Sequence, residues 1–146
     1  MDELVQYLRE ALANTFVMYF KAHQFHWNVE GPNFPQYHSF LGDLYEELQG
    51  AVDPIAEQIR TLDQYAPTSM AAMLAMSAVT EALTIAQPRE MFTSLNNDNM
   101  IVMLTLTKAY EKAEELGHLG ISNFLQDRLT AHEKHGWMLR ATSKNA

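Results

Sequence analysis

The sequence HWNVEGPNF at residues 26–34, followed by His38 and by DPIAE at residues 53–57, organises the rest of the chain. Its Gly31-Pro32 pair separates two long helical patterns, because glycine favours a helix end and proline cannot continue a helix. The candidate site residues are His26 and His38, which lie near this break, and Asp53 and Glu57, which lie further along the second pattern. Any function that needs these side chains depends on how the two helices bring them together.

Apolar residues at spacings of three and four on both sides of the break predict long amphipathic helices. We expect the first helix over about residues 3–29, with Asp2 as its N-cap, and the second over about residues 35–64, with Pro35 in its first turn. Pro54 lies inside the second helix, where proline normally bends the chain. The apolar stripe resumes in phase directly after it, so this helix is predicted to bend but to continue.

The second half of the chain predicts three more helices. A short one is expected over residues 70–76, with Thr68 or Ser69 as its cap. A third long helix is expected over residues 88–116, ended by glycines at positions 117 and 120, and a fourth from Ser122-Asn123 onward.

No strand pattern is present, so the prediction is an all-α protein with a single domain over residues 1–146. Four long helices, with a short extra helix in the connection between helices two and three, indicate a four-helix bundle. The long connection lets helix three run parallel to helix two, the crossover of ferritin-like bundles.

Composition narrows the classes of function. A formal net charge of −8, without a basic patch at either end, argues against binding to DNA phosphate. The absence of cysteine excludes thiolate metal sites and fits a reducing compartment, so we expect a cytoplasmic protein. No apolar run is long enough to span a bilayer and the first residues lack a basic segment, so we expect neither membrane association nor a signal peptide.

The second helix carries ligand-type side chains on a face separate from its apolar stripe. At ~100° per residue, with His38 set to zero, position 42 falls near ~40°, Asp53 near ~60° and Glu57 near ~100°. The apolar stripe falls at roughly 240–300° on the same wheel. This helix therefore has a core face and a second face of histidine and carboxylates.

His38 and Asp53 lie ~22 Å apart along a straight helix, so no single ion can bridge them within one chain. Two copies of the helix can bridge them if they pair antiparallel about a centre near residues 47–48. In that pairing His38 lies opposite the partner's Glu57, and position 42 lies opposite the partner's Asp53. The result is a homodimer with two equivalent sites, to which His26 adds a further nitrogen.

A set of imidazole and carboxylate ligands without thiolates suits iron, with manganese or zinc as substitutes. Open coordination positions favour redox chemistry on Fe(II) over a closed structural site. Trp27, beside His26, is a candidate to pack over the metal or to take up an oxidising equivalent.

The same residues, taken alone, also fit structural roles. His26 fits a core histidine beside a core tryptophan, and His38, Asp53 and Glu57 fit an ordinary solvated face. No Glu-x-x-His motif lies in the middle of a helix, which argues against a di-iron site inside one bundle. Three other histidines are interpreted as structural or surface residues: His23, His132 and His135.

HWNVEGPNF, His38 and DPIAE together resemble the signature of the Dps family, the miniferritins that protect DNA in starved cells, and HEKHGWML at residues 132–139 resembles the family's fourth helix. This resemblance, which covers nearly the whole chain, implies a hollow dodecamer built from two-fold dimers. It also implies oxidation of Fe(II), usually with hydrogen peroxide, and storage of the ferric mineral. By position, it implies His26 and His38 as ligands from one subunit and Asp53 and Glu57 from the other.

The chain departs from the family pattern at Gly42, where the family usually has an acidic residue. Asp43 is a poor replacement because it points ~100° away on the helix. Acidic residues commonly line the family's three-fold pores, but residues 117–123 contain none and the next acid along the chain is Asp127. The lysine-rich DNA-binding tail of some members is also missing. Three hypotheses follow: a ferroxidase and iron-storage cage, a shell with an impaired or absent centre, and a DNA-coating protein, which the charge disfavours.

Overall fold

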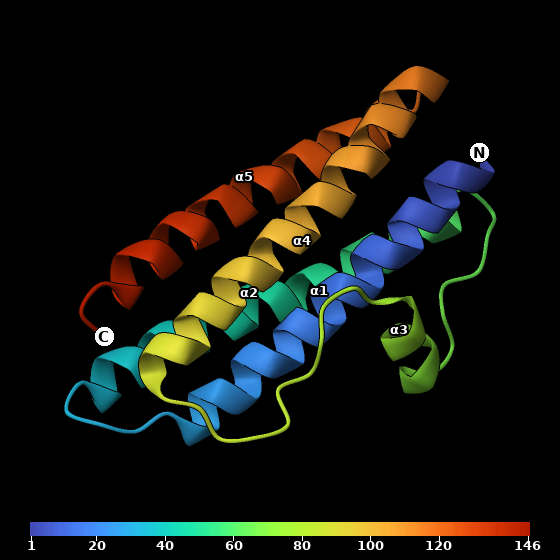
Figure 1. Cartoon of the computed structure of the whole chain (residues 1–146). Helices are drawn as coiled ribbons and strands as arrows, with labels where there is room; N and C mark the ends of the chain where they lie inside the picture. Colours follow the sequence, from blue (N-terminus) through green and yellow to red (C-terminus); the bar gives the residue numbers. More distant parts are fainter.

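The computed structural model describes all of residues 1–146 and contains five helices and no strand. The helices are α1 (Asp2–Asn28), α2 (Phe34–Thr61), α3 (Met70–Met76), α4 (Pro88–Leu116) and α5 (Leu119–Ser143). Four long helices form a bundle, and the short α3 lies beside α1 in the connection between α2 and α4 (Figure 1). The all-α four-helix bundle with an extra short helix is therefore confirmed.

Helix α2 returns antiparallel to α1, α4 runs parallel to α2, and α5 returns antiparallel to α4 (Figure 1). Helix α1 packs against α2 and α4, and α4 packs against α5, whereas α2 makes only a few contacts with α5. The predicted crossover is thus confirmed. Because α2 has one close neighbour, part of its surface has no helix over it.

The apolar stripe of α2 enters the core as predicted. Each of its members is at most 3% exposed, whereas Asp53 and Glu57 on the other face are exposed. The helix continues through Pro54, as expected. The stripe within the helix consists of Leu41, Leu44, Leu48, Ile55 and Ile59. Leu62, which was also predicted to belong to it, is half-buried at the C-cap.

Two predicted helix starts were wrong. Met1, not Asp2, is the N-cap of α1, and Asp2 lies in the first turn, where its charge complements the helix dipole. Helix α5 begins at Leu119, not at Ser122, because Gly117 alone provides the left-handed residue (φ 75°) that ends α4. Gly120 was expected to stop the third helix but lies inside α5 instead.

The end of α2 lies earlier than predicted, whereas the cap of α3 agrees with the prediction. Helix α2 ends at Thr61, before the expected residue 64, and Asp63 adopts a positive φ of 61° just beyond it. Ser69 caps α3 as predicted, since its hydroxyl accepts the backbone N–H of Ala72 at 3.1 Å.

Polar side chains of α1 fix the connection that leads to α4. The side-chain oxygen of Asn14 accepts the N–H of Ala78 at 2.7 Å and the hydroxyl of Ser77 at 3.1 Å. Its amide nitrogen donates to the hydroxyl of Thr105 on α4 at 3.0 Å. One buried asparagine therefore joins α1, the connection and α4.

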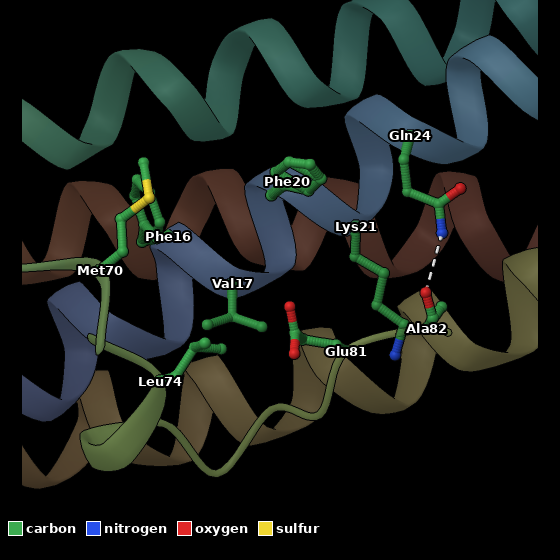
Figure 2. A pocket seen from close by; sticks show the side chains of 9 residues that line it. All are labelled: Phe16, Val17, Phe20, Lys21, Gln24, Met70, Leu74, Glu81 and Ala82. Atoms are coloured by element: carbon green, nitrogen blue, oxygen red, sulfur yellow. Dashed lines mark hydrogen bonds between the residues drawn. The ribbon is translucent and has the colours of Figure 1, made fainter. Parts of the chain in front are cut away.

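Further along α1, Lys21 contacts the same connection. Its Nζ donates to the backbone oxygen of Thr80 at 3.0 Å and pairs with Asp98 on α4 at 3.0 Å. Burial raises the pKa of Asp98, and the charge of Lys21 opposes that rise. The neighbouring Gln24 donates to the backbone oxygen of Ala82 (Figure 2).

Candidate metal centre

The turn between α1 and α2 brings His26 and His38 together. The Nδ1 atom of each histidine lies 2.7 Å from the backbone oxygen of the other. A carbonyl oxygen can only accept, so each neutral ring carries its proton on Nδ1 and keeps the lone pair of Nε2. The rings stack with their centroids 3.7 Å apart and their planes 16° apart. Both imidazoles are therefore held in the tautomer that a metal ion requires.

Glycine and the local hydrogen bonds of the turn explain this pairing. Gly31 adopts a φ of 121°, which side chains other than glycine rarely accept. The N–H of Phe34 donates to the oxygen of Gly31 at 3.0 Å and starts α2 at once. His38, one turn into α2, thus lies beside His26 in the last turn of α1.

Gly42 lies one turn after His38, directly under the ring of His26. A Cβ atom at position 42 would lie 3.1 Å from Cε1 and 3.3 Å from Nδ1 of His26. That contact is tight, so an acidic residue at this position requires the His26 ring to shift by a few tenths of an ångström. The absence of a side chain at position 42 therefore lets the ring of His26 lie close to α2.

Asp53 and Glu57 lie one turn apart on the exposed face of α2. A hydrogen bond to Asp53, together with the repulsion of its charge, raises the pKa of Glu57. Two carboxylates that share a proton in this way gain from a nearby cation, which removes their repulsion.

The predicted ligands form two pairs within one chain, not one centre. His26 and His38 meet at the α1–α2 turn, while Asp53 and Glu57 meet several turns further along α2. No three histidine, aspartate or glutamate side chains of the chain lie close enough to hold a metal ion together.

Further aromatic rings border the histidine pair. The ring of His23 lies flat on Tyr45, with centroids 3.7 Å apart and planes 6° apart, and the hydroxyl of Tyr19 lies 3.0 Å from His23 Nδ1. Burial, with a smaller contribution from His26, lowers the pKa of His23. Trp27 is 56% exposed and packs against His23, at 4.3 Å, not over His26. Neither tyrosine stands out in the sequence as a site residue, because each fits an ordinary helix position.

A second cluster of ionisable groups joins α2 to α5. Arg128 donates to both carboxylate oxygens of Glu47, at 2.5 and 3.0 Å, and His135 Nε2 lies 2.6 Å from one of them. These hydrogen bonds and charges hold the pKa of Glu47 well below its usual range, against the effect of burial. The sequence gives no sign that Glu47 and Arg128 pair, since they lie on helices far apart in the chain.

His132 extends this cluster into the core. Its Nε2 lies 3.0 Å from Arg128 Nη2, which can only donate, so its Nδ1 carries the proton and donates to Asn99 Oδ1 at 2.8 Å. Burial, followed by the charges of Arg128 and His135, lowers the pKa of His132 to about 3. His132 is fully buried and has the structural role expected of it. The guanidinium of Arg128 supplies the positive charge of this cluster.

An apolar hollow of about 190 Å³ lies between α1, α3 and the connection (Figure 2). Lys21 and Glu81 are its only charged lining residues, and Lys21 already pairs with Asp98. The hollow therefore has no set of metal ligands. Its other lining residues are Phe16, Val17, Phe20, Gln24, Met70, Leu74 and Ala82. No helix of the chain combines the length and apolar content needed to cross a membrane.

Comparison with known proteins places the bundle in a class. The model of the ferritin-like domain family matches residues 5–146. A DNA protection during starvation protein of Brevibacillus brevis is 34% identical over 92% of this chain and 90% of its own length. The chain belongs to the Dps family of ferritin-like proteins, which confirms the resemblance seen in the sequence.

Solved structures agree with this assignment. The crystal structure of Dps from Staphylococcus aureus superposes with a TM-score of 0.93 at 30% identity, covering 98% of this chain and 96% of that one. A Dps protein from Vibrio cholerae O1, described as a member of a broad superfamily of ferritin-like diiron-carboxylate proteins, gives a TM-score of 0.92 at 29% identity. It covers 96% of this chain and 88% of its own. The predicted ferritin-like fold is thereby confirmed.

Proposed function

We propose that this protein oxidises Fe(II), with hydrogen peroxide as the oxidant, and stores the ferric product inside an oligomeric shell. Membership of the Dps family and the diiron-carboxylate description of the Vibrio cholerae relative support this function. The observation that carries it is the reciprocal bonding of His26 and His38, which leaves both Nε2 lone pairs available to a metal. Such a device protects the cell by consuming peroxide and free Fe(II) together.

The reactive site is proposed to form between two copies of the chain. The histidine pair and the carboxylate pair lie far apart on the same helix, and the exposed face of α2 has no helix over it. An antiparallel pairing of two α2 helices brings His26 and His38 of one copy to Asp53 and Glu57 of the partner subunit. Each two-fold dimer then has two such sites, and six dimers make the expected dodecamer.

For the oxidation of Fe(II) by peroxide, the protein needs only to bind the iron ions and orient them. Two Fe(II) ions are the substrates, each giving one electron, and peroxide takes both electrons with two protons to form two waters. The histidine nitrogens and carboxylate oxygens are ligand types that suit iron, and the same set accommodates zinc or manganese as a substitute. The net charge of −8 favours the approach of cations.

Ferric absorbance after addition of Fe(II) and peroxide tests the assigned residues. Asp53→Asn and His26→Gln should each slow the rise in absorbance at least tenfold, since each removes an iron ligand. Asp43→Asn is the matched control, because Asp43 is also an exposed acid of α2 but lies on a different face. Rates that stay unchanged in the first two variants would remove the assigned site.

Mixed assemblies test whether the site is shared. A variant without both histidines and a variant without both carboxylates should each be inactive alone. Co-expression forms dimers in which one of the two sites is intact, so about a quarter of the wild-type sites should return. A site contained within one chain predicts no recovery at all.

The second candidate is a shell whose centre is impaired, and the specific observation in its favour is Gly42. Position 42, where the family usually has an acid, is a glycine packed closely against the ring of His26, so one of the two metal positions lacks a ligand. Binding of about one Fe(II) per site rather than two, measured anaerobically by calorimetry, would support this candidate over a complete di-iron centre.

A further inference from the structure

Tyr19 and His23 lie one turn apart on α1 and form a pair of a phenol and a base. The Tyr19 oxygen is 3.0 Å from His23 Nδ1, within the range for direct proton transfer. A phenol has a pKa of ~10 and holds its proton firmly, but loses it readily once an electron has been removed. A base already in contact lets the electron and the proton leave together, so no charged radical remains in a half-buried place.

A series of aromatic rings connects this pair to the proposed iron site. Tyr45 is the central ring: its centroid lies 3.7 Å from that of His23, 6.2 Å from that of Tyr19 and 5.2 Å from that of His26. No step between neighbouring rings is longer than 6.2 Å between centroids, and the shortest, between His23 and Tyr45, is a parallel stack. An electron can therefore pass from Tyr19 to the iron ligand His26 without a diffusing carrier.

The electron count gives this path a use. Peroxide takes two electrons, whereas one Fe(II) ion supplies only one. Glycine at position 42 provides no ligand beside His26 and His38, which favours sites that hold a single iron ion. A singly occupied site that reacts with peroxide releases a hydroxyl radical unless a second electron arrives at once.

We propose that Tyr19 supplies this second electron and His23 accepts its proton, so that a site with one iron still reduces peroxide to water. This inference rests on the proposed ferroxidase function. Fe(II) loses one electron, and Tyr19 loses one electron and the hydroxyl proton, which moves to His23 Nδ1. The O–O bond of peroxide breaks, and the two electrons with two protons from solvent give two waters. A later Fe(II) reduces the tyrosyl radical, and His23 returns the proton.

Among the rings of this cluster, Tyr19 is the one whose proton has an acceptor in place. Trp27 also touches His23 but is 56% exposed, and its indole N–H makes no hydrogen bond within the chain. The hydroxyl of Tyr45 likewise has no such partner, so Tyr45 transmits an electron but does not hold the radical.

Freeze-quench electron paramagnetic resonance tests the donor with one Fe(II) per site and peroxide. The wild type should show a neutral tyrosyl radical, and Tyr19→Phe should lose most of it while ferric absorbance persists. Spin-trapped hydroxyl radical should rise several-fold in that variant. Tyr7→Phe, a half-buried tyrosine of the same helix, is the matched control and should match the wild type. An equal tyrosyl signal in Tyr19→Phe would overturn the proposal.

An iron-free experiment separates this inference from the proposed function. A photogenerated ruthenium(III) polypyridyl oxidant should oxidise a tyrosine of the metal-free protein in a fast phase with a solvent deuterium isotope effect. Tyr19→Phe should remove that phase, and His23→Phe, which keeps a ring but removes the base, should slow it several-fold. A fast phase that survives in both variants would refute the pair. A fast phase that is lost in Tyr19→Phe and slowed in His23→Phe, in a protein that does not oxidise Fe(II), would support the pair and refute the ferroxidase function.

Discussion

The Nδ1 atoms of His26 and His38 each lie 2.7 Å from the other residue's backbone oxygen, so each histidine fixes the tautomer of its partner. Neither ring depends on a metal ion for its orientation. The cost of ordering the two side chains is met during folding, when the α1–α2 turn closes. Binding of a metal then requires little further loss of conformational freedom.

The first prediction concerns these tautomers. In the metal-free protein at neutral pH, long-range ¹⁵N–¹H spectra should show both His26 and His38 protonated at Nδ1. Added Zn²⁺, a redox-inert substitute for Fe(II), should shift their Nε2 resonances and leave Nδ1 protonated. His118, which lies outside the site, serves as the internal reference. Protonation at Nε2 in either histidine would contradict the reciprocal hydrogen bonds from Nδ1 to the backbone oxygens.

The second prediction separates the two effects of a side chain at position 42. Gly42→Ala adds a Cβ at 3.1 Å from the His26 ring without a ligand, and its helix propensity gain of about 0.5–1 kcal/mol should be offset by that crowding. Gly42→Asp adds the same Cβ and a carboxylate. Anaerobic Fe(II) titration should therefore give tighter or additional binding in Gly42→Asp only. If Gly42→Ala and Gly42→Asp bind equally, the missing acid is not what limits the site.

The third prediction is a pH dependence of metal binding. Asp53 raises the pKa of Glu57, so protons compete with a cation at this pair over a higher pH range than at an isolated glutamate. The apparent affinity for Zn²⁺ should fall as the pH drops through that raised pKa. Asp53→Asn removes the charge that raises the pKa of Glu57. This variant should bind Zn²⁺ more weakly, and its affinity should begin to fall only at a lower pH than in the wild type. Identical pH profiles would show that the two carboxylates do not share a proton.

Local patterns in the sequence were enough to predict the helices and the core. Leu41 and Ile59 belong to one stripe because their spacing follows the helix period, and the stripe is buried in the structure. The start of α5 was missed because two glycines looked equivalent, whereas a single left-handed residue, Gly117, completes the turn. The spacing of apolar residues predicts which face of a helix is buried. The residue at which a helix begins or ends depends instead on its cap.

Contacts between distant helices could not be predicted in the same way. Glu47 reads as an ordinary polar residue of α2, and its partner Arg128 is 81 positions away on α5. His26 and His38 were predicted as ligands from their residue type and position, and this assignment stays a prediction; their bonds to each other's backbone depend on how the turn closes. Residue chemistry indicated candidate groups, whereas packing decides what each of them contacts.

The last prediction concerns acid stability and the buried His132. Its pKa is lowered to about 3 in the folded protein, whereas an unfolded histidine has a pKa of ~6.5. Between these values the unfolded chain binds a proton that the folded chain does not, so the free energy of unfolding falls as the pH falls. The slope from this one group approaches ~1.4 kcal/mol per pH unit and should already be present between about pH 6 and 5. Glu47, whose pKa is lowered from about 4.5, adds to acid destabilisation only at lower pH.

Urea denaturation at several pH values measures this slope. His132→Gln keeps a donor and an acceptor for Asn99 and Arg128 but does not titrate. Its free energy of unfolding should be lower than that of the wild type at neutral pH. Between pH 6 and 5 it should stay nearly constant, whereas that of the wild type falls. His118→Gln, outside the cluster, should keep the wild-type slope. Because protonated His132 would face the guanidinium of Arg128 at 3.0 Å, the folded protein has no arrangement that accepts the proton without breaking the α2–α5 cluster. A wild-type slope retained in His132→Gln would show that another group causes the acid sensitivity.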